Sequence, residues 1–508
     1  MSTRIAALTR AVGRALAWRF SPYVLAGLCA VLPLDGPGGV VCGQPRPLPN
    51  IVLILADDLG WRDLGCCGST FHETPALDRL AAEGMRLTQA YAAANVCSPT
   101  RASILTGKYP ARLHTTNFFG GDRRGKLLPP EYRQFLPTEE VTLAEALRRH
   151  GYRTAIAGKW HLGGKGSLPS DHGFEVVIGQ HCAPGRGPDD DPHFSTLLST
   201  EAARFIEESR EKPFFLYLPL HSVHVPLKTR PDLLAKYEKK AAALPPPAGP
   251  REVRVHDHRA RAVQDHPVYA GMVQEMDEAV DRVLKKLDAL KLTDRTIVLF
   301  TSDNGGLCTA EGSPTANLPL RAGKGWNYEG GLRVPLIVRW PGRVPAGKTC
   351  DVPVISNDFY PTFMALAGLP MPAEQKVDGV NVAPLLEGKG TIAPRPLFWH
   401  YPHYSNQGGR PSGAIRVGNE KLIESFEDGR IELFDLAGDE GETHDLASAR
   451  PDSAQGLSKR LAAWREEVGA QMPTPNPRPV DPFGPEGLPK PKPKPKAKAK
   501  TAPAKGTP

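Results

Sequence analysis

Short continuous apolar runs alternate with amphipathic stretches along most of the chain. Strands covered on both faces typically have such runs, which here occupy residues 50–56, 153–157, 213–218, 296–300 and 335–340. Residues 74–84, 142–150 and 269–292 have helical patterns; the first has Pro near its start and Gly at its end, and Gly151 closes the second. This alternation predicts an α/β fold built from βαβ units with a mostly parallel sheet.

The pattern changes at about residue 394, where shorter alternating segments such as 413–417 and 431–435 begin. We therefore predict a main domain over residues 46–393 and a smaller antiparallel C-terminal subdomain over 394–470. Residues 471–508 are rich in Pro and Lys and cannot bury a core, so we expect a disordered tail.

The first 45 residues have the pattern of an export signal. Arginines precede an apolar run, Tyr23–Leu34, and a small-residue and Pro-rich stretch follows it. The run is short for a spanning helix, which needs ~20 apolar residues, so we expect signal cleavage and no stable membrane span afterwards. The predicted location is periplasmic, cell-surface or secreted. A lipoprotein anchored at Cys29 or Cys42 and a retained disordered extension are the alternatives.

Composition narrows the function classes. The 508 residues are 40% hydrophobic, which is ample for a large core, and carry a net charge of +8. Seven lysines beyond residue 487 and an excess of three positive charges in the first 45 residues leave −2 for the body, so we expect no nucleic-acid partner. Eight cysteines are too few for a disulfide framework and show no zinc-like spacing, so most are read as small buried residues, with at most one pair.

Acidic and amide side chains follow two of the predicted strands. Asp57 and Asp58 come after residues 50–56, and Asp303 and Asn304 come shortly after 296–300. Open α/β sheets bind ligands at the carboxyl ends of their strands, and adjacent carboxylates repel unless a cation neutralises them. These hard oxygen donors suit Ca²⁺ or Mg²⁺ better than zinc or copper. Taken singly, each pair is also compatible with an ordinary turn.

Cys97 begins a predicted helix that ends at Gly107, with Ser98 as its N-cap and Pro99 in its first turn. A helix N-terminus stabilises an anion, and Arg101 lies one turn along on the same face. The alternative is a buried structural cysteine beside a surface arginine.

Basic side chains follow other predicted strands. In extended backbone Lys159 and His161 point to the same side, which suits anion binding and proton transfer. His221 and His224 follow residues 213–218, and their spacing does not decide which of them is functional. Lys324 lies in a glycine-flanked loop that can approach a ligand closely. Singly, these are also compatible with solvated or structural side chains.

Together these segments resemble the type I, formylglycine-dependent, arylsulfatase-like sulfatases of the alkaline phosphatase superfamily, over about residues 50–446. The matching blocks, in the order of the family, are Ala56–Gly60, Cys97–Arg101 with Thr106–Gly107, Gly158–Gly163, Val223–Leu227, Ser302–Gly306, and Gly323–Gly325 through Tyr328–Pro335. No chemical position departs from the family pattern.

The resemblance implies an alkaline-phosphatase-like α/β/α sandwich with a largely parallel central sheet and a smaller C-terminal α+β subdomain with an antiparallel sheet. It also implies one Ca²⁺ ion, with Mg²⁺ the weaker alternative, and oxidation of Cys97 to formylglycine by a separate maturation enzyme. The metal ligands it implies are Asp57, Asp58, Asp303, Asn304 and the oxidised side chain at Cys97. The catalytic side chains it implies are Arg101, Lys159, His161, His224 and Lys324.

The function expected from this resemblance is hydrolysis of sulfate monoesters, with aryl sulfates as in vitro substrates and sulfated glycans as natural ones. One alternative is a phosphonate or phosphate ester hydrolase of the same superfamily. A non-catalytic secreted glycan-binding protein is the other. Loops 117–136, 181–193 and 402–410 are expected to line the pocket, and their Arg, His and Asn residues are compatible with a sulfated sugar.

Overall fold

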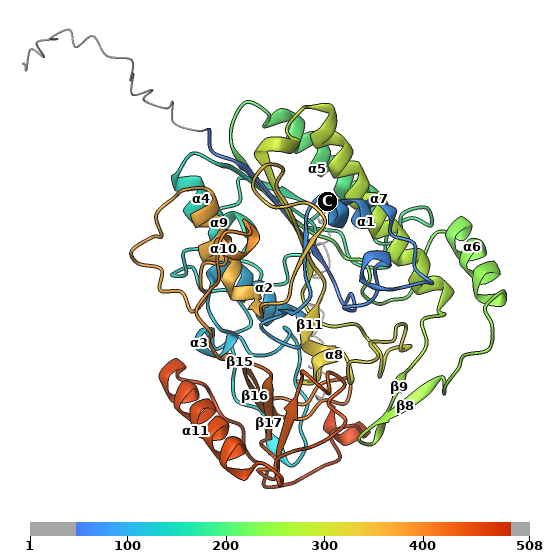
Figure 1. Ribbon diagram of the computed structural model, residues 1–508, viewed down its shortest axis with the longest axis vertical. Coiled ribbons are helices and arrows are strands. Elements are labelled where there is room, and N and C mark those ends of the chain that lie inside the picture. Colours follow the sequence, from blue (N-terminus) through green and yellow to red (C-terminus); the bar gives the residue numbers. More distant parts are fainter. Residues whose placement is uncertain (1–46, 489–508) are drawn as a thin grey trace, which may run out of the picture. The chain divides into compact units, whose positions relative to one another are not determined.

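The computed structural model describes residues 47–488 (Figure 1). The predicted signal peptide, residues 1–45, lies outside the described residues. Within the described range no helix has both the length and the apolar character that crossing a membrane requires.

An eight-stranded sheet forms the centre of the fold. In spatial order its strands are β13 (Lys348–Cys350), β2 (Met85–Leu87), β12 (Leu336–Arg339), β10 (Thr296–Ser302), β1 (Asn50–Ala56), β7 (Phe214–Pro219), β5 (Arg153–Ala157) and β6 (Val176–Ile178). β10, β1, β7, β5 and β6 pair in parallel, whereas β12 runs antiparallel to both of its neighbours. The prediction of a largely parallel sheet is confirmed.

β1 shows why the sheet is covered on both faces. Ile51, Leu53 and Leu55 belong to one buried core and Val52 and Ile54 to the other, because successive side chains of a strand point to opposite faces. Each such burial contributes roughly 1.5–3 kcal/mol.

Helices on both faces complete an α/β/α sandwich (Figure 1). One face is covered by α1 (Pro75–Ala82), α5 (Ser195–Glu208) and α7 (Pro267–Ala289), with α6 (Pro231–Ala242) packed on α7. The other face is covered by α2 (Cys97–Thr106), α4 (Leu143–Arg149), α9 (Phe359–Leu366) and α10 (Ala383–Leu386).

A second, antiparallel sheet follows in the C-terminal part, as expected. It consists of β15 (Leu397–Tyr401), β16 (Ser412–Val417), β17 (Glu420–Ser425) and β18 (Ile431–Asp435), with α11 (Pro451–Val468) packed on it. Trp464 of α11 stacks on Phe398 with ring centroids 4.6 Å apart. Side chains of this sheet share one core with Tyr91 and Trp326, so apolar packing joins the second sheet to the part of the chain that precedes it.

A buried charge cluster also joins the second sheet to the preceding chain. Lys421 of β17 contacts Glu329 at 2.9 Å and Glu442 at 2.8 Å, and all three side chains are at most 1% exposed. Glu329 belongs to α8 (Glu329–Leu332), which comes before the second sheet in sequence.

The remaining elements are short. They are α3 (Pro110–Leu113), the strands β11 (Arg333–Val334), β3 (Ala90–Tyr91) and β14 (Val354–Ile355), the hairpin β8 (Glu252–Val255) and β9 (His258–Arg261), and the pair β4 (Leu127–Leu128) and β19 (Thr474–Pro475). β19 lies in the segment for which we expected disorder. That expectation does not fit residues 471–488, since backbone pairing with β4 holds this stretch on the body; residues 489–508 lie outside the described range.

Candidate active site

The site forms where parallel strands end at one edge of the central sheet. Ala56 of β1 pairs with Ser302 of β10, so Asp57 and Asp303 leave the sheet side by side. Glycines allow the chain to pass closely here. A Cβ added to Gly158, which follows β5 with φ of 126°, would lie 2.1 Å from the Pro219 carbonyl oxygen.

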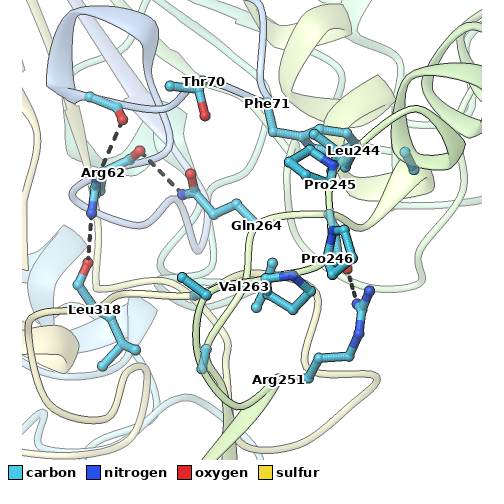
Figure 2. Close-up of a pocket in the computed structure, with 17 residues that line it drawn as sticks. Arg62, Thr70, Phe71, Leu244, Pro245, Pro246, Arg251, Val263, Gln264 and Leu318 are labelled. Carbon is cyan, nitrogen blue, oxygen red and sulfur yellow. Dashed lines mark hydrogen bonds and ion pairs between the residues drawn. The ribbon is translucent and has the colours of Figure 1, made fainter.

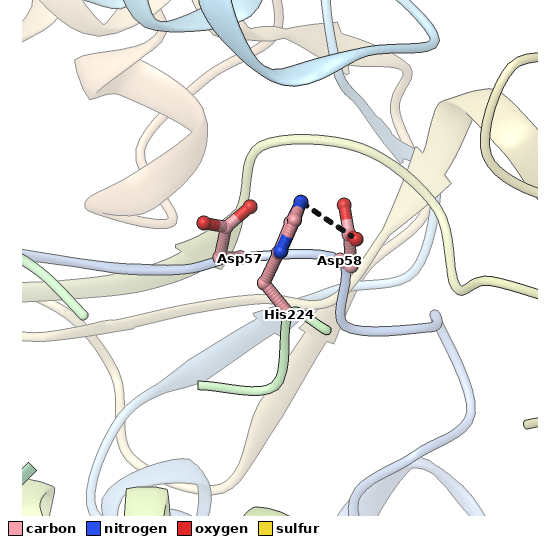
Figure 3. Close-up of side chains that lie close together, drawn as sticks. All are labelled: Asp57, Asp58 and His224. Atoms are coloured by element: carbon pink, nitrogen blue, oxygen red, sulfur yellow. Dashed lines mark ion pairs between the residues drawn. The ribbon is translucent and has the colours of Figure 1, made fainter. Parts of the chain in front are cut away.

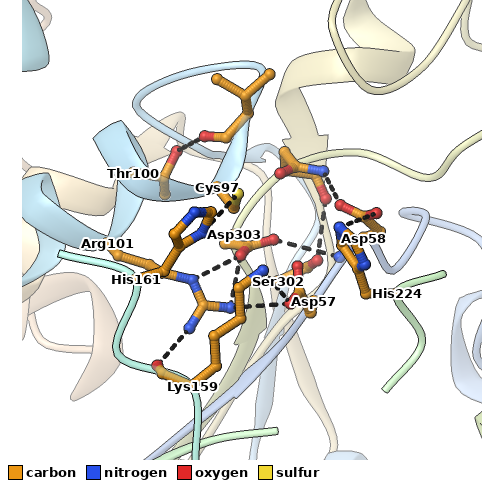
Figure 4. A network of polar contacts seen from close by, with 12 residues as sticks. Asp57, Asp58, Cys97, Thr100, Arg101, Lys159, His161, His224, Ser302 and Asp303 are labelled. Atoms are coloured by element: carbon orange, nitrogen blue, oxygen red, sulfur yellow. Dashed lines mark hydrogen bonds and ion pairs between the residues drawn. The ribbon is translucent and has the colours of Figure 1, made fainter. Parts of the chain in front are cut away.

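Asp57 is fully buried and faces cations. Lys159 Nζ donates to its Oδ2 at 2.5 Å, and Arg101 Nη2 lies 3.6 Å away (Figure 4). Burial opposes ionisation, but Lys159, His224 and Arg101 outweigh it and hold the pKa of Asp57 well below its ordinary value.

Asp58 is held in the same way from the other side. Lys324 Nζ donates to its Oδ2 at 2.7 Å, and Asn304 Nδ2 donates to its Oδ1 at 2.9 Å. Figure 3 shows His224 beside the two aspartates, with Nε2 3.7 Å from Asp58. Burial works against ionisation of Asp58 too, yet Lys324 and His224 lower its pKa. The ligand atoms of Asp57, Asp58 and His224 lie within 4.8 Å of one another.

Asp303 accepts two bonds from Arg101, from Nε at 2.9 Å and Nη2 at 2.7 Å. Burial and the adjacent Asp57 carboxylate nevertheless raise the pKa of Asp303 well above its ordinary value. Three buried carboxylates in one place therefore leave one of them hard to ionise, a condition that an additional cation relieves.

The donor set fits a hard divalent cation. Asp57 Oδ1 and Asn304 Oδ1 are buried oxygens without a hydrogen-bond partner among residues 47–488, and most buried polar atoms have one. Together with Asp58 and Asp303 they offer oxygen ligands only, the kind that Ca²⁺ and Mg²⁺ take.

Cys97 is the first residue of α2 and is 2% exposed. Its Sγ lies 3.3 Å from His161 Nδ1, and it forms a second compact group with Asp57 and Asp303. The expected N-cap is wrong: Val96 caps the helix, and the Ser98 hydroxyl instead accepts the Phe119 backbone N–H at 3.3 Å. Gly107 ends the helix with φ of 70°, as predicted.

Lys159 and His161 both reach the cluster, but not on extended backbone. β5 ends at Ala157, and His161 has a left-handed φ of 53°. Burial, followed by the charges of Lys159 and Arg101, lowers the pKa of His161 to about 3, so its imidazole is neutral at pH 7.

A cavity of about 430 Å³ opens beside these residues, lined by Lys159, His161, His221 and the segment 179–184. His221 is 3% exposed, and neither of its ring nitrogens has a partner among the described residues. The loop predicted from residue 181 thus contributes to this wall. A larger cavity of about 800 Å³ lies between Arg62, Phe71, Pro245 and Leu318 and contains none of the predicted site residues (Figure 2).

Asp63 supports the site and was missed from the sequence. It is fully buried and accepts bonds from the Gly60 N–H at 2.8 Å, the Tyr269 hydroxyl at 2.6 Å and the Thr315 hydroxyl at 2.6 Å. It thereby fixes the turn that follows Asp58. Tyr269 and Thr315 lie more than 200 residues away in sequence, so these contacts could not be predicted from the local pattern.

Comparisons with known proteins agree with this geometry. Residues 49–369 match the Sulfatase family, and residues 322–467 match the family described as N-sulphoglucosamine sulphohydrolase, C-terminal. The chain therefore belongs to the sulfatase family, which is part of the alkaline phosphatase superfamily, and is a sulfatase enzyme.

Three similar proteins illustrate the family. N-acetylgalactosamine-6-sulfatase of Canis lupus familiaris is 34% identical over 73% of this chain and 72% of its own length. Arylsulfatase A of Homo sapiens is 33% identical over 84% of this chain and 89% of its own. The crystal structure of Ps i-CgsB is 29% identical with a TM-score of 0.68, covering 82% of this chain and 93% of that one.

The arrangement brings the predicted site residues together at one sheet edge. Figure 4 shows eight of them, from Asp57 and Asp58 to Cys97, Arg101, Lys159, His161, His224 and Asp303. Three cations, three carboxylates, a neutral imidazole and the N-terminus of α2 lie together here, with His161, Asp57 and Asp303 next to Cys97. Such a site can bind a tetrahedral anion, and in this family that chemistry is the cleavage of sulfate esters.

Proposed function

We propose that the protein cleaves sulfate monoesters through a formylglycine hydrate made from Cys97. The observation that carries this proposal is the position of Cys97, which begins α2 with His161 3.3 Å from its sulfur and Asp57 and Asp303 in the same compact group. A maturation enzyme is needed to convert the thiol to the aldehyde.

We assign the metal to Asp57, Asp58, Asp303, Asn304 and the modified side chain at position 97. The two unpartnered oxygens of Asp57 and Asn304 support this assignment, and Ca²⁺ is the proposed ion. When bound, it supplies positive charge beside the sulfate oxygens. Arg101 contacts Asp303 through two nitrogens, so its role is to hold that carboxylate and, with Lys159, to orient the hydrate.

In the first step one hydroxyl of the hydrate attacks sulfur and passes its proton to the Asp303 carboxylate, which lies in one compact group with Cys97, while the bond from sulfur to the alcohol oxygen breaks. Lys159 and Lys324 stabilise the charge on the transferred group's oxygens. Nδ1 of His224 donates to the Val225 carbonyl oxygen at 2.7 Å, which leaves Nε2 as the nitrogen that takes up and gives a proton. In its imidazolium form His224 gives the leaving alcohol the proton on Nε2.

In the second step His161 takes the proton of the remaining hydroxyl. The bond from carbon to the sulfated oxygen then breaks, sulfate leaves and the aldehyde is restored. A pKa of about 3 keeps His161 free to accept this proton at neutral pH. A simple serine or cysteine ester offers no such route and would need a separate attack by water.

The natural substrate we propose is a sulfated glycan. The name of the canine relative specifies a sulfated amino sugar, and the export signal predicted for residues 1–45 would place the enzyme outside the cytoplasm with such polymers. Aryl sulfates are the expected small in vitro substrates, as the name of the human relative indicates.

The test is a matched panel of 4-nitrophenyl sulfate, 4-nitrophenyl phosphate and a 4-nitrophenyl phosphonate ester, given to protein co-expressed with a formylglycine-generating enzyme. We expect the sulfate to be hydrolysed fastest and the Cys97→Ala variant to hydrolyse none of the three. Faster turnover of the phosphonate would assign the site to the rival ester hydrolases, and glycan binding without any hydrolysis would assign it to a binding protein.

A further inference from the structure

The C-terminal segment 471–488 lies beyond both family matches, the second of which ends at residue 467. It is nevertheless tied to the chain just before and within β4. Asn476 donates from its backbone to Lys126 O at 2.9 Å and from its side chain to Gly125 O at 2.8 Å. The Arg124 N–H donates in turn to Gly487 O at 3.1 Å. The segment therefore fixes the conformation of residues 121–128.

The same loop begins at the catalytic cluster. Phe119 packs edge-on against His161 with ring centroids 5.8 Å apart, and its N–H contacts Ser98, the neighbour of Cys97. Asn117 accepts a bond from the Tyr401 hydroxyl at 3.0 Å. Residues 117–128 thus run from beside the nucleophile to the C-terminal segment.

Arg123 lies within this stretch and is held by both the C-terminal segment and Asn406. Its Nη1 donates to Pro482 O at 2.5 Å, Nε and Nη2 lie 3.4 and 3.2 Å from Asn406 Oδ1, and its guanidinium is 6.0 Å from the Phe483 ring centroid. A guanidinium has five N–H groups, so these contacts leave two of them for a ligand. Among residues 47–488 no carboxylate lies within ion-pair distance of it.

Unlike Arg123, two nearby arginines each have an acidic partner. Arg124 lies 3.8 Å from Asp122, and Arg410, which also lies over Phe483, contacts Glu427 at 2.8 Å and Asp257 at 3.1 Å. Their charges are matched within the protein. A half-buried arginine without an acidic partner has lost part of its hydration, which an anionic ligand would replace.

The loop itself relates Arg123 to the nucleophile. Arg123 lies four residues from Phe119, whose ring packs against His161, and the Tyr401 hydroxyl donates to Asn117 Oδ1 at 3.0 Å in the same loop. Asn406, which contacts the Arg123 guanidinium, follows Tyr401 by five residues. The nucleophile and Arg123 therefore lie along one short stretch of chain, which suits two anionic groups on one oligosaccharide, one at the reacting centre and one on an adjacent sugar.

We propose that Arg123, positioned by Pro482 and Phe483 of the C-terminal segment, binds a second anionic group of the glycan, next to the sulfate that is cleaved. This anion subsite rests on the proposed sulfatase activity for its substrate class. A carboxylate of a uronic acid and a second sulfate ester share the chemistry that Arg123 recognises.

Competitive inhibition of 4-nitrophenyl sulfate hydrolysis tests the subsite. The probes are a heparin-derived hexasaccharide, rich in sulfate, and a galacturonate hexasaccharide, which carries carboxylates only. For each variant the inhibition constant of the probe is divided by the KM of the same variant for 4-nitrophenyl sulfate. This ratio separates a change in binding at the subsite from a change in binding at the reacting centre. We expect Arg123→Ala to raise this ratio about tenfold for at least one probe, since a charged hydrogen bond is worth ~1.5–3 kcal/mol.

Arg124→Ala is the matched control, because that arginine is adjacent in sequence but paired with Asp122. We expect it to change the ratio less than twofold. Phe483→Ala is expected to raise the ratio in the same direction as Arg123→Ala, and Phe483→Tyr to restore it, as a positioning role requires. Arg123→Gln, which keeps most of the side chain's volume, replaces Arg123→Ala if that variant melts early.

Equal ratios for Arg123→Ala and Arg124→Ala with both probes would overturn the proposal, as would a wild-type enzyme that neither probe inhibits. If the protein hydrolyses no sulfate ester at all, the proposed function fails separately. Calorimetric titration of the same two probes into wild type and Arg123→Ala then tests the anion subsite alone, with loss of binding expected in the variant and equal binding contradicting it.

Discussion

The cluster around Asp57 and the cluster around Lys421 both remove charged side chains from water, but their oxygen atoms differ in what they contact. In the second cluster Lys421 contacts one oxygen of Glu329 and one of Glu442, while the Tyr91 hydroxyl and the Glu329 N–H donate to the other two. Three of these four carboxylate oxygens accept hydrogen bonds, and the fourth, Glu442 Oε1, makes none but lies 2.8 Å from the Lys421 ammonium. In the first cluster Asp57 Oδ1 and Asn304 Oδ1 have no hydrogen-bond partner among the described residues.

Burial of charge therefore does not by itself identify the active site. The Lys421 cluster joins β17 of the second sheet to α8. The Asp57 cluster lies at strand ends, beside a cavity of about 430 Å³ and the first turn of α2, where ligands can enter. Its three carboxylates are balanced by Lys159, Lys324 and Arg101, so a divalent cation would leave a positive site suited to a sulfate ester.

We expect the largest difference between the two clusters when the nucleophile is replaced, because this change should remove activity and leave stability intact. Cys97→Ala removes the precursor of the aldehyde, so sulfate release should fall at least ~10³-fold. The melting temperature should stay close to that of the wild type, because a small side chain replaces a small one. Steady-state release of sulfate from 4-nitrophenyl sulfate measures the first effect and calorimetry the second. Retention of more than a tenth of the activity would contradict the assignment.

Lys421→Met should reduce stability and leave the activity of the folded enzyme intact, the opposite of Cys97→Ala. It leaves two buried carboxylates without their cation, so we expect a loss of ~3–5 kcal/mol in the free energy of unfolding. The kcat of the remaining folded enzyme should be unchanged, since Lys421 belongs to the second sheet. Urea denaturation together with active-site titration checks both quantities, and a stable but inactive variant would place the Lys421 cluster in the chemistry.

Lys324→Ala tests the catalytic cluster from its cationic side. Lys324 contacts Asp58 at 2.7 Å and is assigned to the charge on the transferred group. We expect kcat to fall ~10²–10³-fold, the range for loss of one stabilising donor. Burst and steady-state kinetics with 4-nitrophenyl sulfate measure this, and a change confined to KM would restrict Lys324 to ground-state binding.

Metal addition should stabilise one cluster only. With Ca²⁺ at 100 times its dissociation constant, mass action adds ~2.7 kcal/mol to stability. Asp303→Asn should abolish this gain, whereas Glu442→Gln should retain it. Melting temperatures of chelator-treated protein with and without added Ca²⁺ provide the comparison. A gain that survives in Asp303→Asn would place the ion elsewhere.

The smallest effect concerns pH. Burial, with the Glu329 carboxylate adding to it, raises the pKa of Glu442 from 4.5 to about 7. A raised carboxyl pKa means that its stabilising contribution is complete below about pH 4.5 and is lost as pH rises to about 7. Between pH 5 and 7.5 wild type should lose on the order of 1–3 kcal/mol more than Glu442→Gln. Urea midpoints of wild type and Glu442→Gln that change with pH by the same amount would refute the raised pKa of Glu442.

The sequence was sufficient for the parts of the fold whose pattern is local. Continuous apolar runs predicted β1, β5 and β10, and the acidic pairs after two of them predicted where the strand ends meet. Contacts between distant segments could not be predicted. The Ser98 hydroxyl accepts from Phe119, 21 residues away, rather than capping its own helix, and β19 pairs with β4 over only two residues.

The most direct test of the account is the mass of the tryptic peptide that contains Cys97, measured on the same preparation whose sulfate release is assayed with and without chelator. We expect the thiol at position 97 to be replaced by an aldehyde, with sulfate release in proportion to the converted fraction and lost on chelation. A fully converted residue that releases no sulfate in the presence of Ca²⁺ would contradict the central claim.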